Sequence, residues 1–158
     1  ANAHRPWQLY RAVFQELLAR CQPLAQGRRK FRFKNKLVSL DSTVIDLCAT
    51  LFDWAKFRRS KGAVKLHLLL DHDGYLPSVV VITEGRRHDV RVARTLRFEP
   101  GTIAVIDRGY VDSAWFGRLT TDEVFFVTRL KANALYEVVE RRRVPERSPV
   151  RRDEVPFA

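Results

Sequence analysis

The chain of 158 residues has no methionine, only two cysteines, and 18 acidic residues against 29 basic ones. Cys21 and Cys48 lack CxxC spacing and lie in hydrophobic surroundings, so we interpret them as reduced core residues and exclude a zinc site or disulfide. No run approaches the ~18 apolar residues of a membrane span, and the start does not resemble a secretory signal. We therefore expect a soluble intracellular protein. The absence of methionine and the start at Ala1 suggest an excerpt of a longer protein.

The shortage of acids leaves a formal charge of +11 and a pI near 10.4. Such a field attracts and orients polyanions whatever the fold, so nucleic acid is the expected partner. A membrane surface or ribosomal RNA remains an alternative partner for the same charge. The length and a hydrophobic content of 46% predict one globular domain with a real core.

Hydrophobic periodicity predicts an α/β order of elements. We expect helices over residues 6–21, 88–96 and 112–119. We expect strands over residues 37–47, 64–71, 76–83, 102–106 and 124–128, the first three forming a meander. Because a strand-helix-strand unit implies parallel pairing, the last two strands should lie beside the first in a mixed, twisted sheet.

Two aspartates stand out against this pattern. Residues 102–106 predict a buried strand in a sheet covered on both faces, and Asp107 at its end is held rigidly yet can reach solvent, as a metal ligand must. The alternative is that Asp107 merely begins a turn. Asp41 lies inside a strand, where Asp is rare and a buried charge is costly unless it is compensated. Two carboxylates on neighbouring central strands can hold a pair of Mg²⁺ (or Mn²⁺) ions about 3.5–4 Å apart for phosphodiester chemistry.

Basic residues cluster on both sides of the Asp41 strand. Residues 26–36 and 54–65 contain no acid, and each stretch is either a solvated surface or an edge that contacts phosphates. The candidate nucleic-acid contacts are Lys34, Lys36, Lys56, Arg58, Arg59, Lys61, Arg108, Tyr110, Arg129 and Lys131. An arginine beside Asp107 could equally serve as a counter-ion for the carboxylates.

The other polar groups of the predicted sheet are given ordinary structural roles. We interpret His67 and His72 as satisfied polar groups and not as metal ligands. Asp89 opens a predicted helix, where Asp is a good cap and needs no further explanation.

An ordered set of motifs carries a resemblance to a known family. The set comprises LDST, the KxH of Lys65 and His67, DGYLP, TEGRRHD, IDRGY and FFVTRLK. In that order the motifs resemble the bacterial insertion-sequence DDE transposases with a YREK motif, the family whose founding member is numbered four. The resemblance runs from about Trp7 to Tyr136. It implies an RNase H-like fold with a mixed five-stranded sheet flanked by helices.

The resemblance also implies a function, cut-and-paste DNA transposition. Metal-dependent hydrolysis at the transposon ends is followed by transfer of the freed 3′-hydroxyl into target DNA. Asp41 matches the first catalytic Asp of the family, and Asp107 matches the second. Transposon-end and target DNA would be the partners, with a homodimer of the full-length protein and a cytoplasmic, nucleoid-associated location in a bacterium.

The third acid of the family, a Glu in the pattern Tyr-x2-Arg-x3-Glu-x6-Lys, has no match in this sequence. We therefore expect the chain to be truncated before the last catalytic helix, with the third acid beyond Ala158 and little or no strand cleavage by this chain alone. The expected organisation is an N-terminal helical segment (1–30), an incomplete RNase H-like catalytic core (31–134), and the start of an insertion or a disordered tail (135–158).

Two other functions stay open from the residues. One is a non-catalytic basic nucleic-acid-binding module in which both aspartates are structural. The other is a nuclease on the same fold, because hydrolysis uses the same two-metal chemistry.

Overall fold

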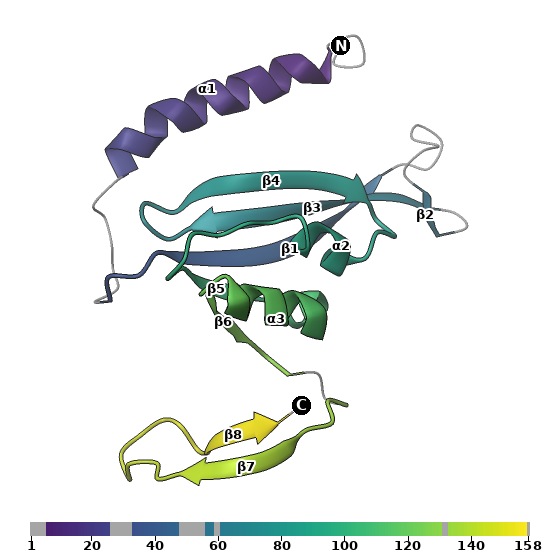
Figure 1. Cartoon of the computed structure of the whole chain (residues 1–158). Coiled ribbons are helices and arrows are strands. Elements are labelled where there is room, and N and C mark those ends of the chain that lie inside the picture. The colour runs from purple at the N-terminus through teal and green to yellow at the C-terminus, as the bar shows by residue number, and fades with distance from the viewer. Residues whose placement is uncertain (1–5, 26–32, 48–55, 59–60, 131–132, 158) are drawn as a thin grey trace.

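A mixed β-sheet is the centre of the molecule (Figure 1). The structure, a computed structural model, describes residues 6–25, 33–47, 56–58, 61–130 and 133–157. The strands of the sheet are β1 (Leu37–Leu47), β2 (Lys56–Arg58), β3 (Lys61–Asp71), β4 (Leu76–Glu84), β5 (Ile103–Ile106) and β6 (Phe125–Thr128). The five predicted strands are confirmed, and β2, which spans only three residues, was not predicted.

The strand order is β4-β3-β1-β5-β6, with β2 beside the first residues of β3. The pairs β1–β3 and β3–β4 are antiparallel, whereas β1–β5 and β5–β6 are parallel. The predicted meander and the two later parallel strands are therefore confirmed. A mixed sheet of this kind, flanked by helices, agrees with the predicted RNase H-like α/β fold.

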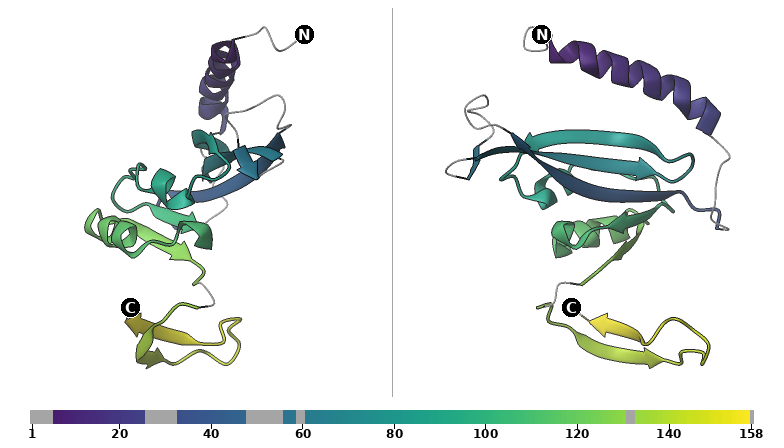
Figure 2. Two further views of the ribbon diagram at one scale, coloured as in Figure 1. Left: turned by 90° about the vertical axis from the view of Figure 1, so that its right-hand side faces the viewer. Right: turned by 180° about the vertical axis from the view of Figure 1, so that it is seen from behind.

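One face of the sheet is covered by α2 (Asp89–Ala93) and α3 (Ser113–Thr121), which Figure 2 shows on the same side. Side chains alternate between the faces of a strand, so every second residue of β1 and β5 points to these helices. The largest members of the core that results are Trp115, Leu119 and Tyr110. Tyr110 ends a single 3₁₀ turn, η2 (Arg108–Tyr110), that directly follows Asp107.

The opposite face of the sheet is largely open within the described residues. Val105, Phe125 and Val127 all expose more than a third of their surface there. The prediction that the 102–106 strand is covered on both faces is therefore wrong, because burial alternates along β5.

Helix α1 (Trp7–Ala25) lies beyond the β4 edge, in both views of Figure 2 (top), and touches the sheet through its last turn. Ala25 is buried against Gly74, whose φ of +103° requires glycine in the β3–β4 turn. The apolar stripe of α1 is exposed at Leu9, Val13 and Leu17. Cys21 is also exposed, so its predicted core position is wrong, and Cys48 lies outside the described residues.

Strands β7 (Glu137–Arg142) and β8 (Asp153–Phe157) form a separate antiparallel hairpin at the end of the chain. No helix in the part of the chain that the structure describes combines the length and hydrophobicity needed to span a bilayer.

The core makes a prediction about stability. Leu119→Ala should lower the free energy of unfolding by about 2–5 kcal/mol, because this 2% exposed side chain would leave a cavity between α3 and the sheet. Leu135→Ala is the matched control, since Leu135 is 94% exposed and should change stability by no more than about 0.5 kcal/mol. Urea unfolding measures both values, and equal effects would contradict this assignment of the core.

Candidate active site

The register of the two central parallel strands brings Asp41 and Asp107 to neighbouring positions. Leu37 of β1 pairs with Ile103 of β5, and the pairing continues in step to Leu40 and Ile106. Asp41 is the next residue of β1, Asp107 directly follows β5, and the Asp107 N–H donates to the Leu40 carbonyl at 3.4 Å. Since adjacent strands lie about 4.8 Å apart, both carboxylates start from adjoining backbone positions.

Asp41 points to the open face of the sheet. Its neighbour Leu40 is buried against the helices, so the alternation of the strand directs Asp41 the other way, and its side chain is exposed. One carboxylate oxygen accepts the Ser42 N–H at 2.7 Å. The prediction that Asp41 is a costly buried charge is therefore wrong, and the carboxylate stands open to a ligand from solvent.

Asp107 is held in place from two directions. Its Oδ1 accepts the Gly109 N–H at 3.0 Å, and its Oδ2 pairs with the Arg129 guanidinium at 3.1 Å. The Gly109 N–H, followed by Arg129, keeps the pKa of Asp107 below its ordinary value. Asp107 is therefore an ionised, oriented and partly exposed carboxylate at the rim of the sheet, as a hard cation requires.

A buried polar cluster lies on the helix-covered face behind these residues. His67 and Tyr110 are each 1% exposed, and their Nδ1 and Oη atoms are 2.8 Å apart. The other ring nitrogen of His67 meets Thr83 Oγ1 at 3.1 Å. Burial lowers the pKa of His67 and raises that of Tyr110, and the carboxylates of Asp89, Asp41 and Asp107 raise the pKa of Tyr110 further. His67 is thus a satisfied, neutral core group.

Asp89 joins this cluster, which the sequence did not reveal. Its Oδ1 lies 2.8 Å from Lys65 Nζ and 3.8 Å from His67 Nδ1. The N-cap of α2 is His88, and no side-chain hydrogen bond caps the helix, so the interpretation of Asp89 as a cap is wrong. The two partners of Asp89, Lys65 and His67, lie two positions apart on β3. That spacing, which puts both side chains on one face of the strand, was the signal in the sequence for this cluster. Among the described residues, no three His, Cys, Asp or Glu side chains are grouped to hold a metal ion.

The predicted nucleic-acid contacts fall into several places. Arg129 pairs with Asp107, and Arg108 is exposed beside it. Tyr110 faces the core and not the solvent, so its placement does not support a contact with nucleic acid.

The remaining predicted contacts lie in the two basic stretches. Lys34 and Lys36 lie before β1, where Lys36 is 3.7 Å from Asp71. Lys56, Arg58 and Lys61 belong to β2 and the start of β3, whereas Arg59 and Lys131 lie outside the described residues.

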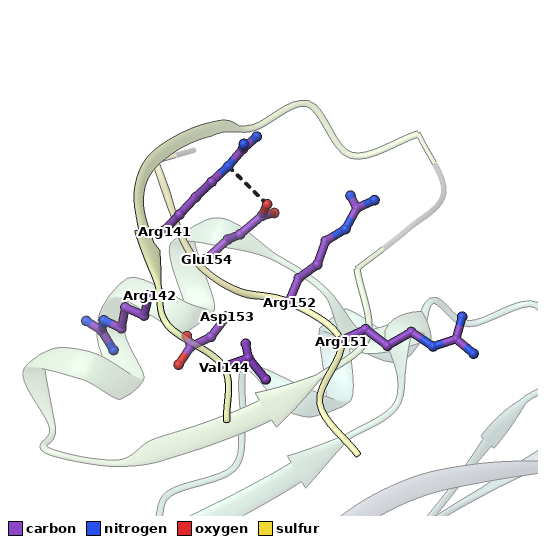
Figure 3. Close-up of a pocket in the computed structure, with 7 residues that line it drawn as sticks. All are labelled: Arg141, Arg142, Val144, Arg151, Arg152, Asp153 and Glu154. Carbon is purple, nitrogen blue, oxygen red and sulfur yellow. Dashed lines mark ion pairs between the residues drawn. The ribbon is translucent and has the colours of Figure 1, made fainter. Parts of the chain in front are cut away.

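Two basic hollows were not singled out from the sequence. One, of about 450 Å³, is lined by Glu84, Arg86, Arg87, His88 and Arg91 in the segment that leads into α2. The other, of about 500 Å³, belongs to the β7–β8 hairpin and is lined by Arg141, Arg142, Val144, Arg151, Arg152, Asp153 and Glu154. Figure 3 shows the Arg141–Glu154 ion pair, 3.3 Å long, facing across the hairpin while Arg151 extends away from it.

Comparisons with known proteins agree on one family. Residues 32–155 match the family model described as "Transposase DDE domain". The chain is 33% identical over 144 residues to "Putative transposase y4zB" of Sinorhizobium fredii, covering 91% of this chain and 39% of that protein. It is 30% identical over 128 residues to "Probable transposase for insertion sequence element IS5377" of Geobacillus stearothermophilus, covering 81% of this chain and 33% of that protein. The chain thus spans well under half the length of either relative, and no solved structure matches it.

The surroundings of Asp107 make a prediction about its titration. Arg129→Gln should raise the pKa of Asp107 but leave it below the ordinary value, because the Gly109 N–H, the larger cause, remains. Because its pKa is depressed in the folded state, Asp107 contributes stability above its ordinary pKa, and this contribution is lost as the pH falls from the ordinary pKa through the folded value. In the variant the contribution should be smaller, and its loss should be complete at a higher pH. Carbon-detected carboxyl NMR measures the shift.

The control for this titration is a second carboxylate with its own arginine. Arg94 lies 2.8 Å from Asp112 and is the largest cause of the lowered pKa of that group. Arg94→Gln should raise the pKa of Asp112 and leave Asp107 unchanged. An Asp107 pKa that does not respond to Arg129→Gln would refute the ion pair.

Proposed function

The chain belongs to the transposase DDE-domain family, and from this premise we propose that it is the part of an insertion-sequence transposase that supplies the first two catalytic acids, Asp41 and Asp107. We place it in the YREK group of insertion-sequence transposases. The whole protein would cut a transposon end out of donor DNA and join its 3′-hydroxyl to target DNA.

The observation that carries this proposal is the adjacency of Asp41 and Asp107 across the β1–β5 pairing. Oxygen ligands of this kind suit Mg²⁺ and Mn²⁺, which would activate the attacking water or hydroxyl and stabilise the oxygen that leaves phosphorus. The exposed Asp41 carboxylate and the ionised Asp107 carboxylate would hold the metal between them. Arg108 and Arg129 would neutralise the charge of the phosphate brought to the same rim.

Two carboxylates leave a metal pair short of ligands, so we propose that this chain alone cleaves DNA little or not at all. The third acid would lie beyond Ala158, in agreement with the greater length of the relatives. In this organisation, residues 31–134 form an incomplete catalytic core, 1–30 an N-terminal helical segment, and 135–158 the start of an insertion.

DNA is the proposed partner, as transposon end and as target, with two copies of the full-length protein acting together. Arg108 is the best-placed contact because it is exposed and adjoins Asp107. The further proposed contacts are Lys34, Lys36, Lys56, Arg58, Arg59, Lys61, Arg129 and Lys131. Arg129 would exchange its carboxylate partner for a phosphate when DNA and metal arrive.

The proposed metal site predicts a metal-linked gain in stability. Mn²⁺ or Mg²⁺ should raise the melting temperature of the chain, since a ligand at a hundredfold excess over its Kd stabilises the folded state by about 2.7 kcal/mol. Asp41→Asn or Asp107→Asn should abolish the gain, as a thermal melt with and without the metal will show.

Asp46→Asn is the matched control for the melt. Asp46 is an exposed Asp on the same strand as Asp41, and its loss should leave the metal response intact. No response in the parent chain would favour a basic nucleic-acid-binding module without catalysis. A longer chain that includes the third acid distinguishes a nuclease from a transposase. A nuclease would nick DNA without joining a 3′-end to target DNA.

The proposed DNA contact predicts a change in salt dependence. Arg108→Gln should weaken binding of duplex DNA and reduce the slope of log K against log salt by about 0.9, the value for one lost phosphate contact. Arg20→Gln removes the same charge from α1, where Arg20 pairs with Glu16, and should reduce the slope less. Fluorescence anisotropy over a salt series measures both, and equal losses would exclude a specific contact at Arg108.

A further inference from the structure

Asp89 has no part in the proposed metal site, and its side chain has unusual partners for the first residue of a helix. It is the first residue of α2, yet its side chain turns away from the helix end towards β3. Lys65 Nζ, which approaches it to 2.8 Å, also donates to the Arg87 carbonyl at 3.2 Å. Lys65 therefore ties both the carboxylate and the loop before α2 to the sheet.

Gly109 shows how close Asp89 comes to the candidate metal ligands. A Cβ atom placed on Gly109 would lie 3.0 Å from Asp89 Oδ2 and 3.4 Å from Asp107 Oδ1. The two carboxylates therefore approach one point on the turn from different elements. The backbone of Gly109 is not in the left-handed region, so a larger residue here would crowd the two carboxylates and would not strain the backbone.

Tyr110 fixes the other end of the same turn. Its N–H donates to the Asp107 carbonyl at 3.0 Å, and its hydroxyl reaches Nδ1 of the buried His67 on β3. Between these two anchors, the Gly109 N–H holds Asp107 Oδ1. The direction of the Asp107 carboxylate thus depends on how firmly this three-residue turn is pressed against the sheet.

We propose that Asp89, held by Lys65, and Tyr110, held by His67, are positioning residues that clamp the Arg108–Tyr110 turn onto the sheet and so direct the Asp107 carboxylate towards Asp41. The inference rests on the proposed metal site for its purpose, but the clamp itself is a property of the folded chain. Groups behind a metal ligand commonly orient it in this way, because a carboxylate on a loose turn would lose entropy on binding. Asp89 also adds negative charge close to Asp107, which favours a cation there.

Two conservative variants test the clamp, Tyr110→Phe and Asp89→Asn. Tyr110→Phe removes only the hydroxyl and should speed amide hydrogen exchange at Gly109 by about fivefold relative to Ala104 in β5, as expected for one lost hydrogen bond. Both variants should weaken Mn²⁺ binding to the 158-residue chain roughly tenfold, the lower end of the range for groups that orient metal ligands. Electron paramagnetic resonance of free Mn²⁺ measures that affinity.

Asp112→Asn is the matched control for Asp89→Asn. Asp112 is 20% exposed and pairs with Arg94 at 2.8 Å, whereas Asp89 is 18% exposed and pairs with Lys65 at the same distance. Asp112 caps α3, and Asn caps a helix as well as Asp does, so this change removes mainly the ion pair with Arg94 and should leave Mn²⁺ affinity unchanged.

The outcomes separate the clamp from the metal site. Equal acceleration at Gly109 and Ala104 in Tyr110→Phe would mean a purely structural role and would overturn the inference. An unchanged Mn²⁺ affinity in Asp89→Asn would overturn the role of Asp89. If the parent chain binds no Mn²⁺, the proposed metal site fails, and the exchange at Gly109 alone then decides whether the clamp exists.

Discussion

The parallel pairing of β1 with β5 is the constraint on which the candidate site depends. The two strands lie far apart in the sequence, and their ladder runs in step from Leu37 and Ile103 to Leu40 and Ile106. Because the side chains of Leu40 and Ile106 are locked into the same core, the register cannot slip by one residue without moving buried groups into solvent. Hydrophobic packing therefore fixes the positions of Asp41 and Asp107, even though their two negative charges repel each other.

The two faces of the sheet have different surroundings on either side of this pairing. The face covered by α2 and α3 holds the buried partners His67 and Tyr110, which give rigidity. The open face leaves Asp41 exposed to solvent. Asp107 lies at the rim between them, with one oxygen bound to its own turn and the other to Arg129. A carboxylate pair that is both oriented and accessible is what the proposed metal site requires.

Much of the fold could be predicted because its signals are local. Alternating apolar residues and the turn at residues 71–74 predicted the meander, and the strand-helix-strand order predicted parallel pairing for β5 and β6. The short β2 has too few residues to produce a pattern. The coverage of each face could not be predicted, because an apolar run such as residues 102–106 looks the same whether one face or two are packed.

The site was predictable only in part, for a related reason. Asp41 and Asp107 stand out within their own strands, whereas Asp89 looks like an ordinary helix cap until Lys65, 24 residues earlier, is placed beside it. Tyr110 likewise lies two residues after the exposed Arg108, and its burial against His67 is a contact between distant segments that the local sequence does not indicate. Contacts between distant segments carry no local pattern, so they appear only once the strands are paired.

The proposed metal site requires that Asp41 and Asp107 bind one divalent cation together. Crystals of the chain grown with Mn²⁺ test it most directly, through the anomalous scattering of the ion. A shared ion should give a peak between the two side chains, with oxygen atoms of both carboxylates in its coordination shell. A peak that contacts only one of them, or well-ordered carboxylates with no peak at saturating Mn²⁺, would contradict it.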